Sequence, residues 1–118
     1  MIPMTVIMSS HMYTIEEVID FCKNNEIVIV NRADGKYEDF MRSVKMTYEE
    51  AIQEIRSLKK DFLYNGPFLD RDIPNNYLYE FHMHVKGKWC YIKLTIDDNK
   101  IVVVRVISFH ESRGVAYA

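Results

Sequence analysis

Hydrophobic and polar residues alternate along residues 77–85, which is the pattern of a β-strand with one buried face. The odd positions from Tyr79 onward are apolar, and the even positions from Glu80 onward are polar. Lys86-Gly87 follows and fits the loop of a two-residue hairpin. In that register the apolar pairs are Met83 with Cys90, Phe81 with Ile92, and Tyr79 with Leu94. A slip of one residue would turn these side chains to the wrong side, so the pattern favours this register.

The same register collects chemically active side chains on the opposite side of the sheet. It pairs His84 with Trp89, His82 with Tyr91, and Glu80 with Lys93. A weaker turn at Asp98-Asn99 then leads into a third strand and places Ser108 across from Trp89, with His110 just beyond it. We call this surface the polar face; its expected residues are Glu80, His82, His84, Trp89, Tyr91, Lys93, Ser108 and His110.

Two features of the third strand conflict with its simple register. Arg105 falls on the apolar face opposite Ile92, which a β-bulge near Val104 would correct. His110 lies too far along its strand to touch Tyr91. The pattern therefore leaves the register of the third strand open by one residue.

Helical periodicity dominates the first half of the chain. Residues 14–25 and a segment from Thr47 onward both begin with the spacing of a capping box. Between them lie a short β-rich run at 26–31 and a helix that starts after Asp34. Residues 64–76, rich in Asn, Gly and Pro, are expected to form a loop. This order predicts an α+β fold, with N-terminal helices packed on the apolar face of a C-terminal antiparallel sheet.

The length of 118 residues predicts a single domain spanning 1–118, with 1–12 as a flexible lead-in or edge strand and 112–118 as a tail. Cys22 and Cys90 both fall on apolar faces and are expected to be buried thiols in a reducing cytoplasm. No apolar run approaches membrane-spanning length, and no signal peptide is evident, so we expect a cytoplasmic protein with no membrane partner. The net charge of −2 does not favour nucleic acid as a partner, although a local patch can still bind it.

The polar face suggests three kinds of chemistry. His82 and His84, with His110 as a third ligand, could hold a metal, but no further ligands join them, and neither a metal nor a cofactor is expected. Ser108 beside His84 would be a nucleophile without an orienting acid, while Cys90 lies on the wrong face.

General acid–base cleavage of a phosphodiester fits the polar face better. It needs a base, an acid, and a cation for the phosphorane charge. Glu80 or a histidine could be the base, and His82 or His110 the acid. Lys93, with Arg105 or Arg71, could supply charge, while Trp89 and Tyr91 offer rings for base stacking. The plain structural alternative is a solvated sheet face with a Glu80–Lys93 pair and two surface histidines.

The stretch GKWCYIKLTI…VISFHE resembles the C-terminal strands of the motility quorum-sensing regulator (MqsR) toxins. The stretches TIEEVIDFCKNNEIVIVNRA and KKDFLYNG resemble the family's N-terminal half, so the likeness covers about residues 14–111. It implies a RelE-like fold, metal-free endoribonuclease activity on mRNA, and neutralisation by a cognate antitoxin. It also implies catalytic roles for Tyr91 and His110, and places a polar residue near Glu80. The family's helix lysine aligns with Tyr64, and the nearest basic residue is Lys60.

We therefore hypothesise a small ribonuclease toxin in which Tyr91 and His110 transfer protons. Lys93 and Lys60 would bind phosphate, and Glu80 or His82 would orient the 2′-hydroxyl group. The alternative is a non-enzymatic regulatory or protein-binding module, encoded by a phage or plasmid, on the same fold. The net negative charge favours that alternative.

Overall fold

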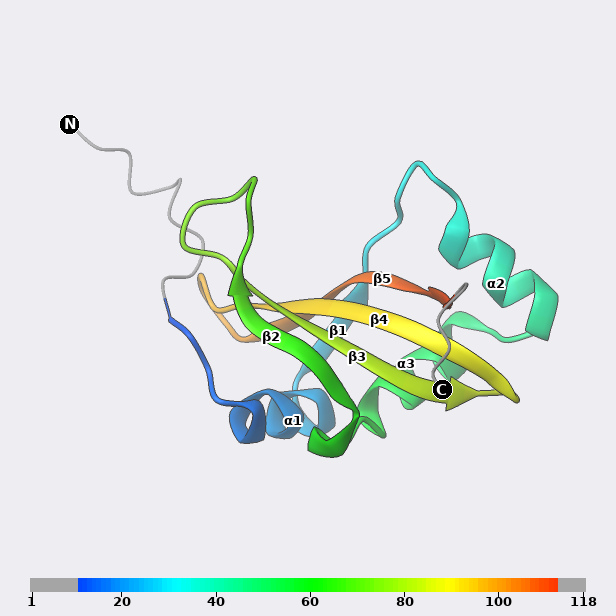
Figure 1. The fold of residues 1–118 in the computed structure, drawn as a ribbon, viewed down its shortest axis with the longest axis horizontal. Coiled ribbons are helices and arrows are strands. Elements are labelled where there is room, and N and C mark those ends of the chain that lie inside the picture. The colour runs from blue at the N-terminus through cyan, green and yellow to red at the C-terminus, as the bar shows by residue number, and fades with distance from the viewer. Residues whose placement is uncertain (1–10, 113–118) are drawn as a thin grey trace.

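Three α-helices and a five-stranded mixed sheet make up the fold in the computed structural model, which describes residues 11–112 (Figure 1). The tail expected beyond residue 112 and most of the lead-in at 1–12 lie outside the described residues. In chain order the elements are α1 (Ile15–Asn24), β1 (Glu26–Ile29), α2 (Lys36–Val44), α3 (Tyr48–Arg56), the 3₁₀ turn η2 (Lys60–Phe62), β2 (Leu63–Leu69), β3 (Tyr77–Val85), β4 (Lys88–Asp97) and β5 (Val103–Glu111).

The helix starts agree with the sequence. The side chains of Thr14 and Thr47 each accept a hydrogen bond from the backbone N–H three residues later. The carboxylates of Glu17 and Glu50 accept one in turn from the backbone N–H of Thr14 and Thr47, so both capping boxes are confirmed. The third helix ends at Arg56, and Phe62 belongs to η2.

The sheet is larger than the three antiparallel strands expected, with strand order β1-β5-β4-β3-β2. β1 pairs in parallel with β5, so a strand from the N-terminal half closes one edge. β2 forms the other edge, where a loop over 64–76 was predicted; the loop spans only 70–76. The α+β class is confirmed, but the prediction of a purely C-terminal antiparallel sheet was wrong.

The β2 strand was missed because its Asn-Gly-Pro sequence normally indicates a turn. Gly66 has a φ of +114°, and a Cβ there would lie 2.6 Å from the carbonyl oxygen of Leu78. Only glycine allows that approach between β2 and β3. The pairing is irregular on both sides of it, so β2 is a bent edge strand.

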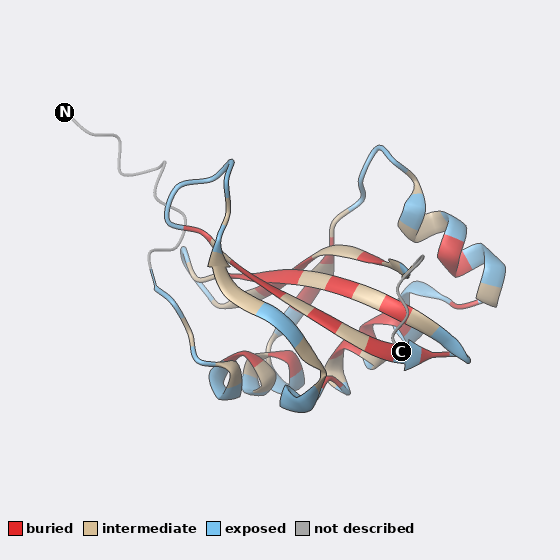
Figure 2. Cartoon of the chain, viewed as in Figure 1, coloured by how far each residue is buried: buried red, intermediate tan, exposed pale blue. Residues whose placement is uncertain are grey.

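The hydrophobic core lies between the sheet and the helices. α1 and α3 lie on one side of the sheet (Figure 1), and the buried residues of the strands and helices face each other across that layer (Figure 2). α2 packs against β5, where Phe40 and Phe109 have ring centroids 5.8 Å apart. Cys22 and Cys90 are buried free thiols, as expected. The opposite side of the sheet is left for the polar face.

Candidate functional site

The β3–β4 hairpin has the predicted register. His84 lies opposite Trp89, His82 opposite Tyr91, and Glu80 opposite Lys93. Lys86 and Gly87 both have positive φ values, 54° and 79°, which suit the tight turns that match the twist of a hairpin. This part of the polar face was therefore fixed by a local turn and an alternating pattern.

The predicted register of the third strand was wrong by three residues as far as Val106 and by four residues beyond it. Leu94 pairs with Val106 instead of Val103, because residues 98–102 form a longer connection than the two-residue turn expected. Arg105 consequently lies opposite Thr95 on the polar face, not opposite Ile92 on the apolar face. The β-bulge falls between the pairs Leu94–Val106 and Lys93–Ser108, not near Val104.

The corrected register brings His110 directly opposite Tyr91, with ring centroids 5.5 Å apart. His82 lies on the other side of Tyr91 at 6.0 Å. The three side chains form a row across β3, β4 and β5, which we call the His–Tyr–His row. The next row is Glu80, Lys93 and Ser108. In the simple register Tyr91 and His110 would not meet; the longer connection and the β-bulge of the observed register bring them together.

The two rows are linked by the Tyr91 hydroxyl, which donates a short hydrogen bond to Glu80. The same carboxylate accepts a second bond, 3.0 Å long, from the amide of Asn65 on β2. Burial and the hydrogen bond to Glu80 raise the pKa of Tyr91 well above its ordinary value. Tyr91 therefore keeps its proton at neutral pH and acts as a hydrogen-bond donor.

Aromatic rings continue from the His–Tyr–His row toward the end of the hairpin. The exposed ring of Tyr64 lies 4.3 Å from that of His82, and Trp89 lies 5.4 Å from His82 on its other flank. His84 is 4.6 Å from Trp89. Burial lowers the pKa of His82, an effect only partly opposed by the charge of Glu80. His82 is therefore mainly neutral at pH 7.

The His110 ring is oriented by its own strand. Its Nδ1 lies 3.0 Å from the carbonyl oxygen of Glu111. A carbonyl oxygen can only accept, so Nδ1 carries the proton in that contact and Nε2 is left for another partner. His110 and Tyr91 also line one wall of a groove of about 710 Å³ beside α2. The imidazole thus faces a space that a ligand can enter.

The basic groups near the two rows come from two strands and one connecting segment. Lys93 lies within the second row, and Arg105 on β5 forms an ion pair with Asp97 at 2.8 Å. Arg32, from the segment between β1 and α2, donates a 3.2 Å hydrogen bond to Ser108. That bond and the position of Ser108 opposite Lys93 correct the expected pairing of Ser108 with Trp89 and His84.

Two predicted phosphate-binding residues lie apart from these rows. Lys60 forms an ion pair with Glu16 of α1 at 3.8 Å, on the helical side of the molecule. Arg71 is exposed in the 70–76 loop. Tyr64 does reach the polar face, through its contact with His82. Across residues 11–112, no group of three or more His, Cys, Asp or Glu side chains is arranged to hold a metal ion.

Two site residues were missed by the sequence analysis. Asn65 was assigned to a turn because Gly-Pro follows it, and only the pairing of β2 with β3 brings it to Glu80. Arg32 follows a short β segment, and a sequence has no local signal for the strand beside which such a segment will pack. Both residues reach the site through long-range pairing.

No family model, curated protein or solved structure matches the chain in comparisons with known proteins. No helix in residues 11–112 has the length and apolar character needed to cross a membrane.

Proposed function

We propose that the protein is a metal-free endoribonuclease that cleaves mRNA, of the toxin type that the resemblance to the MqsR family implies, on a RelE-like arrangement of helices and sheet. The observation that supports this most strongly is the His–Tyr–His row beside Glu80 and Lys93. It supplies two imidazoles, a carboxylate and an ammonium group on one open sheet face. Cleavage of RNA by its own 2′-hydroxyl group needs these kinds of group.

His82 is suited to be the base because burial keeps it mainly neutral near pH 7. It would take the proton of the 2′-hydroxyl group as that oxygen attacks the neighbouring phosphorus. His110, in its protonated form, would give a proton from Nε2 to the departing 5′-oxygen while Nδ1 stays bonded to Glu111. The products are a 2′,3′-cyclic phosphate and a free 5′-hydroxyl group, and the enzyme is left with the proton moved from one histidine to the other.

Tyr91 stands between the two histidines as a neutral hydrogen-bond donor whose partner is Glu80. In this proposal Tyr91 holds Glu80 in place through that hydrogen bond. Its ring contact with His110 positions the imidazole for proton transfer. Lys93 and Arg32 would stabilise the negative charge that develops on the phosphorane. Lys60, which is paired with Glu16, has no part in this version of the site.

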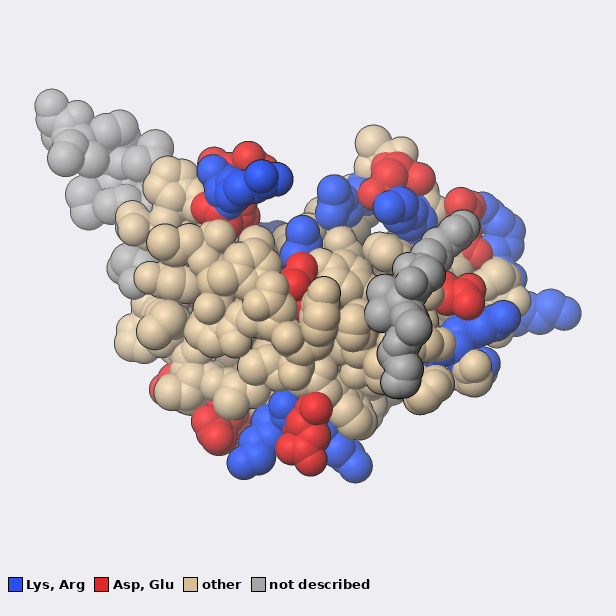
Figure 3. Space-filling model, viewed as in Figure 1, with Lys and Arg blue, Asp and Glu red and all other residues tan. Residues whose placement is uncertain are grey.

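Single-stranded RNA fits the aromatic part of the face. Tyr64, His82 and Trp89 present successive rings on which unstacked bases can lie. On the face visible in Figure 3 the charges of the described residues are mixed in sign, and no broad basic area is visible on it. Stacking would therefore contribute more to binding than electrostatic attraction does.

The direct test uses purified protein and an mRNA that contains all four bases, with chelator present. We expect cleavage that leaves 2′,3′-cyclic phosphate ends, and a loss of at least about 100-fold in rate for His110→Ala and for Tyr91→Phe. Tyr77→Phe, on β3, is the matched control for the loss of a phenol hydroxyl. Absence of cleavage by the wild type would refute the proposal, and undiminished cleavage by both variants would refute the site.

The toxin assignment makes a separate prediction in cells. Induced expression in the cytoplasm should stop growth, and a cognate antitoxin, encoded beside the toxin, should restore it. The His110→Ala variant should be tolerated at the same expression level. Growth arrest by that variant would show that harm arises without cleavage.

A non-enzymatic regulatory or protein-binding module is the second candidate. The mixed charge on the visible face in Figure 3 and the net charge of −2 favour it, because neither attracts RNA strongly. It predicts RNA left intact by the wild type, together with a protein partner whose binding is lost when exposed Tyr64 is changed to Ala. The cleavage assay separates the two functions.

A further inference from the structure

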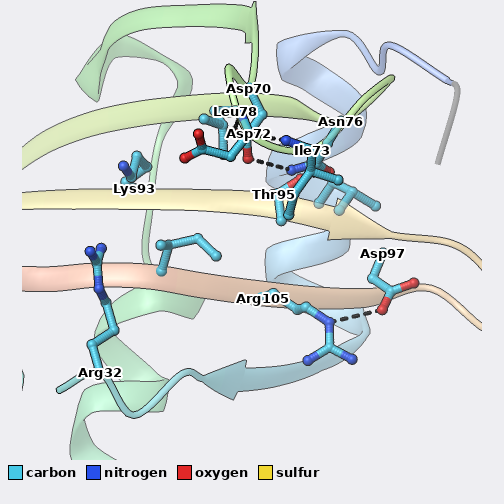
Figure 4. Close-up of a pocket in the computed structure, with 12 residues that line it drawn as sticks. Arg32, Asp70, Asp72, Ile73, Asn76, Leu78, Lys93, Thr95, Asp97 and Arg105 are labelled. Carbon is cyan, nitrogen blue, oxygen red and sulfur yellow. Dashed lines mark hydrogen bonds and ion pairs between the residues drawn. The ribbon is translucent and has the colours of Figure 1, made fainter. Parts of the chain in front are cut away.

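A second concave region lies on the polar face, beyond Lys93 and away from His110. It is a cavity of about 260 Å³ between the 70–76 loop, β4 and β5. In Figure 4, Lys93 and Arg32 lie at one end of it, and Arg105 and Asp97 lie at the other. The volume is close to the lower limit for small-molecule pockets, about 300 Å³, and suits a group no larger than a single nucleotide.

Two of the carboxylates in this cavity already have structural partners. Asp70 accepts bonds from the backbone of Asp72 at 2.8 Å and from the side chain of Asn76 at 3.1 Å. Asp97 accepts from Arg105 and from the backbone N–H of Asn99. Burial alone would raise the pKa of both, but these hydrogen bonds outweigh it and lower the pKa of each carboxyl. The carboxyl groups of Asp70 and Asp97 are therefore ionised at neutral pH and are held in place by their hydrogen-bond partners in the wall of the cavity.

The wall itself is rigid where the loop meets β4. The buried hydroxyl of Thr95 lies 2.9 Å from the side-chain oxygen of Asn76, whose amide reaches Asp70. This chain of hydrogen bonds holds the loop over the sheet before any ligand arrives. A preformed wall lowers the entropy that binding would otherwise cost.

The groups that a ligand could contact are of two kinds. Lys93 and Arg32 supply positive charge at the end nearest Glu80, where Arg32 also lies 3.9 Å from the carboxylate of Asp34. Asp72, which is exposed, extends from the loop toward the same end but from the opposite wall (Figure 4), and its carboxylate can accept hydrogen bonds. Arg105 lies at the other end of the cavity, where its Nε is bonded to Asp97 (Figure 4). A ligand with an anionic group and an edge bearing N–H donors would match this arrangement.

We propose that this cavity is a nucleotide subsite next to the cleaved bond. Lys93 and Arg32 bind the phosphate, and the base enters under the 70–76 loop with its exocyclic amino group toward Asp72. Adenine, guanine and cytosine carry such an amino group and uracil does not, so the subsite discriminates against uridine. This inference rests on the proposed function for its place along the RNA, because Lys93 belongs to both sites.

Binding of the four 5′-mononucleotides to the full chain, measured by calorimetry, tests the subsite without requiring cleavage. We expect the three amino-bearing nucleotides to bind at least about fivefold more tightly than uridine monophosphate, since a charged hydrogen bond favours them. Asp72→Asn should reduce that preference to less than about twofold, whereas Asp61→Asn, another exposed aspartate, should leave it unchanged. Lys93→Gln should weaken all four, and Lys59→Gln should not.

Equal binding of the four nucleotides, no binding of any, or the same result for Asp72→Asn and Asp61→Asn would overturn the subsite. The outcomes also separate it from the proposed function. Cleavage of RNA without base discrimination by Asp72 leaves the ribonuclease and removes the subsite. Discrimination among nucleotides without RNA cleavage supports the nucleotide site and refutes the ribonuclease.

Discussion

The Tyr91 hydroxyl donates its hydrogen bond to Glu80, not to a residue directly opposite it. Its direct neighbour on β3 is His82, so the bond to Glu80 runs diagonally across the hairpin. This leaves the imidazole of His82 outside the bond and joins the two polar rows into one unit. Asn65 completes it by donating to the other oxygen of the same carboxylate.

This diagonal bond should be measurable as an energetic coupling in the folded protein. Tyr91→Phe should lower the free energy of unfolding by about 1 kcal/mol, and Glu80→Ala, which also leaves Asn65 without its acceptor, by about 2 kcal/mol. The double variant should lose less than the sum of the two, since the second change removes a bond that is already broken. Urea denaturation gives all three values. Additive losses would show that the two side chains do not interact in solution.

The lowered pKa of His82 predicts how stability changes with pH. In the unfolded chain the pKa of His82 is about 6.5, and burial in the folded protein lowers it. Between these two pKa values the unfolded chain binds more protons than the folded protein does. The contribution of His82 to stability is therefore complete above about pH 6.5 and is lost as the pH falls to the folded pKa. His82→Gln should remove this part of the loss, whereas the same change at exposed His84 serves as the control. Equal pH profiles for the two variants would contradict the burial of His82.

Gly66 should be far less tolerant of substitution than Gly87. A Cβ at Gly66 would lie 2.6 Å from the carbonyl oxygen of Leu78, whereas at Gly87 nothing lies within 4 Å. Both have positive φ, so both alanine variants carry a cost of about 1 kcal/mol, and Gly66→Ala adds the displacement of β2. Because Asn65 precedes Gly66, the RNA cleavage that we propose should also fall in that variant. Thermal unfolding of both checks this, and similar melting temperatures would argue against the close β2–β3 approach.

The sequence predicts this fold best where a contact is local. The register of β3 and β4 follows from Lys86-Gly87 and an uninterrupted alternation, and the helix starts follow from Thr14 and Thr47. Each of these signals lies within a few residues of the structure that it determines. They are sufficient to place His82 beside Tyr91.

The remaining pairings depend on residues far apart in the chain. Residues 101–107 are almost all apolar, so they do not show by alternation which side faces the core. The register of β5 was therefore wrong by three residues, and by four beyond the bulge. No tight turn joins β1 to β5, so no local sequence signal indicates that these two strands pair in parallel. Arg32 and Asn65 enter the site through just such pairings. Sequence reasoning therefore found most of the site and missed Arg32 and Asn65, which reach it through long-range pairing.

Binding of RNA should depend only weakly on salt. Lys93 and Arg32 are the two cations assigned to phosphate, so the logarithm of affinity should fall with the logarithm of salt concentration with a slope of about −1.4. A 2′-O-methyl oligonucleotide, which cannot be cleaved, allows the measurement, and quenching of Trp89, the only tryptophan in the chain, reports stacking directly. Lys93→Gln should reduce the slope by about 0.7, and Lys59→Gln should not change it. A slope of about −4 or steeper would mean that a wider basic surface binds the backbone, because each further phosphate contact releases more counterion.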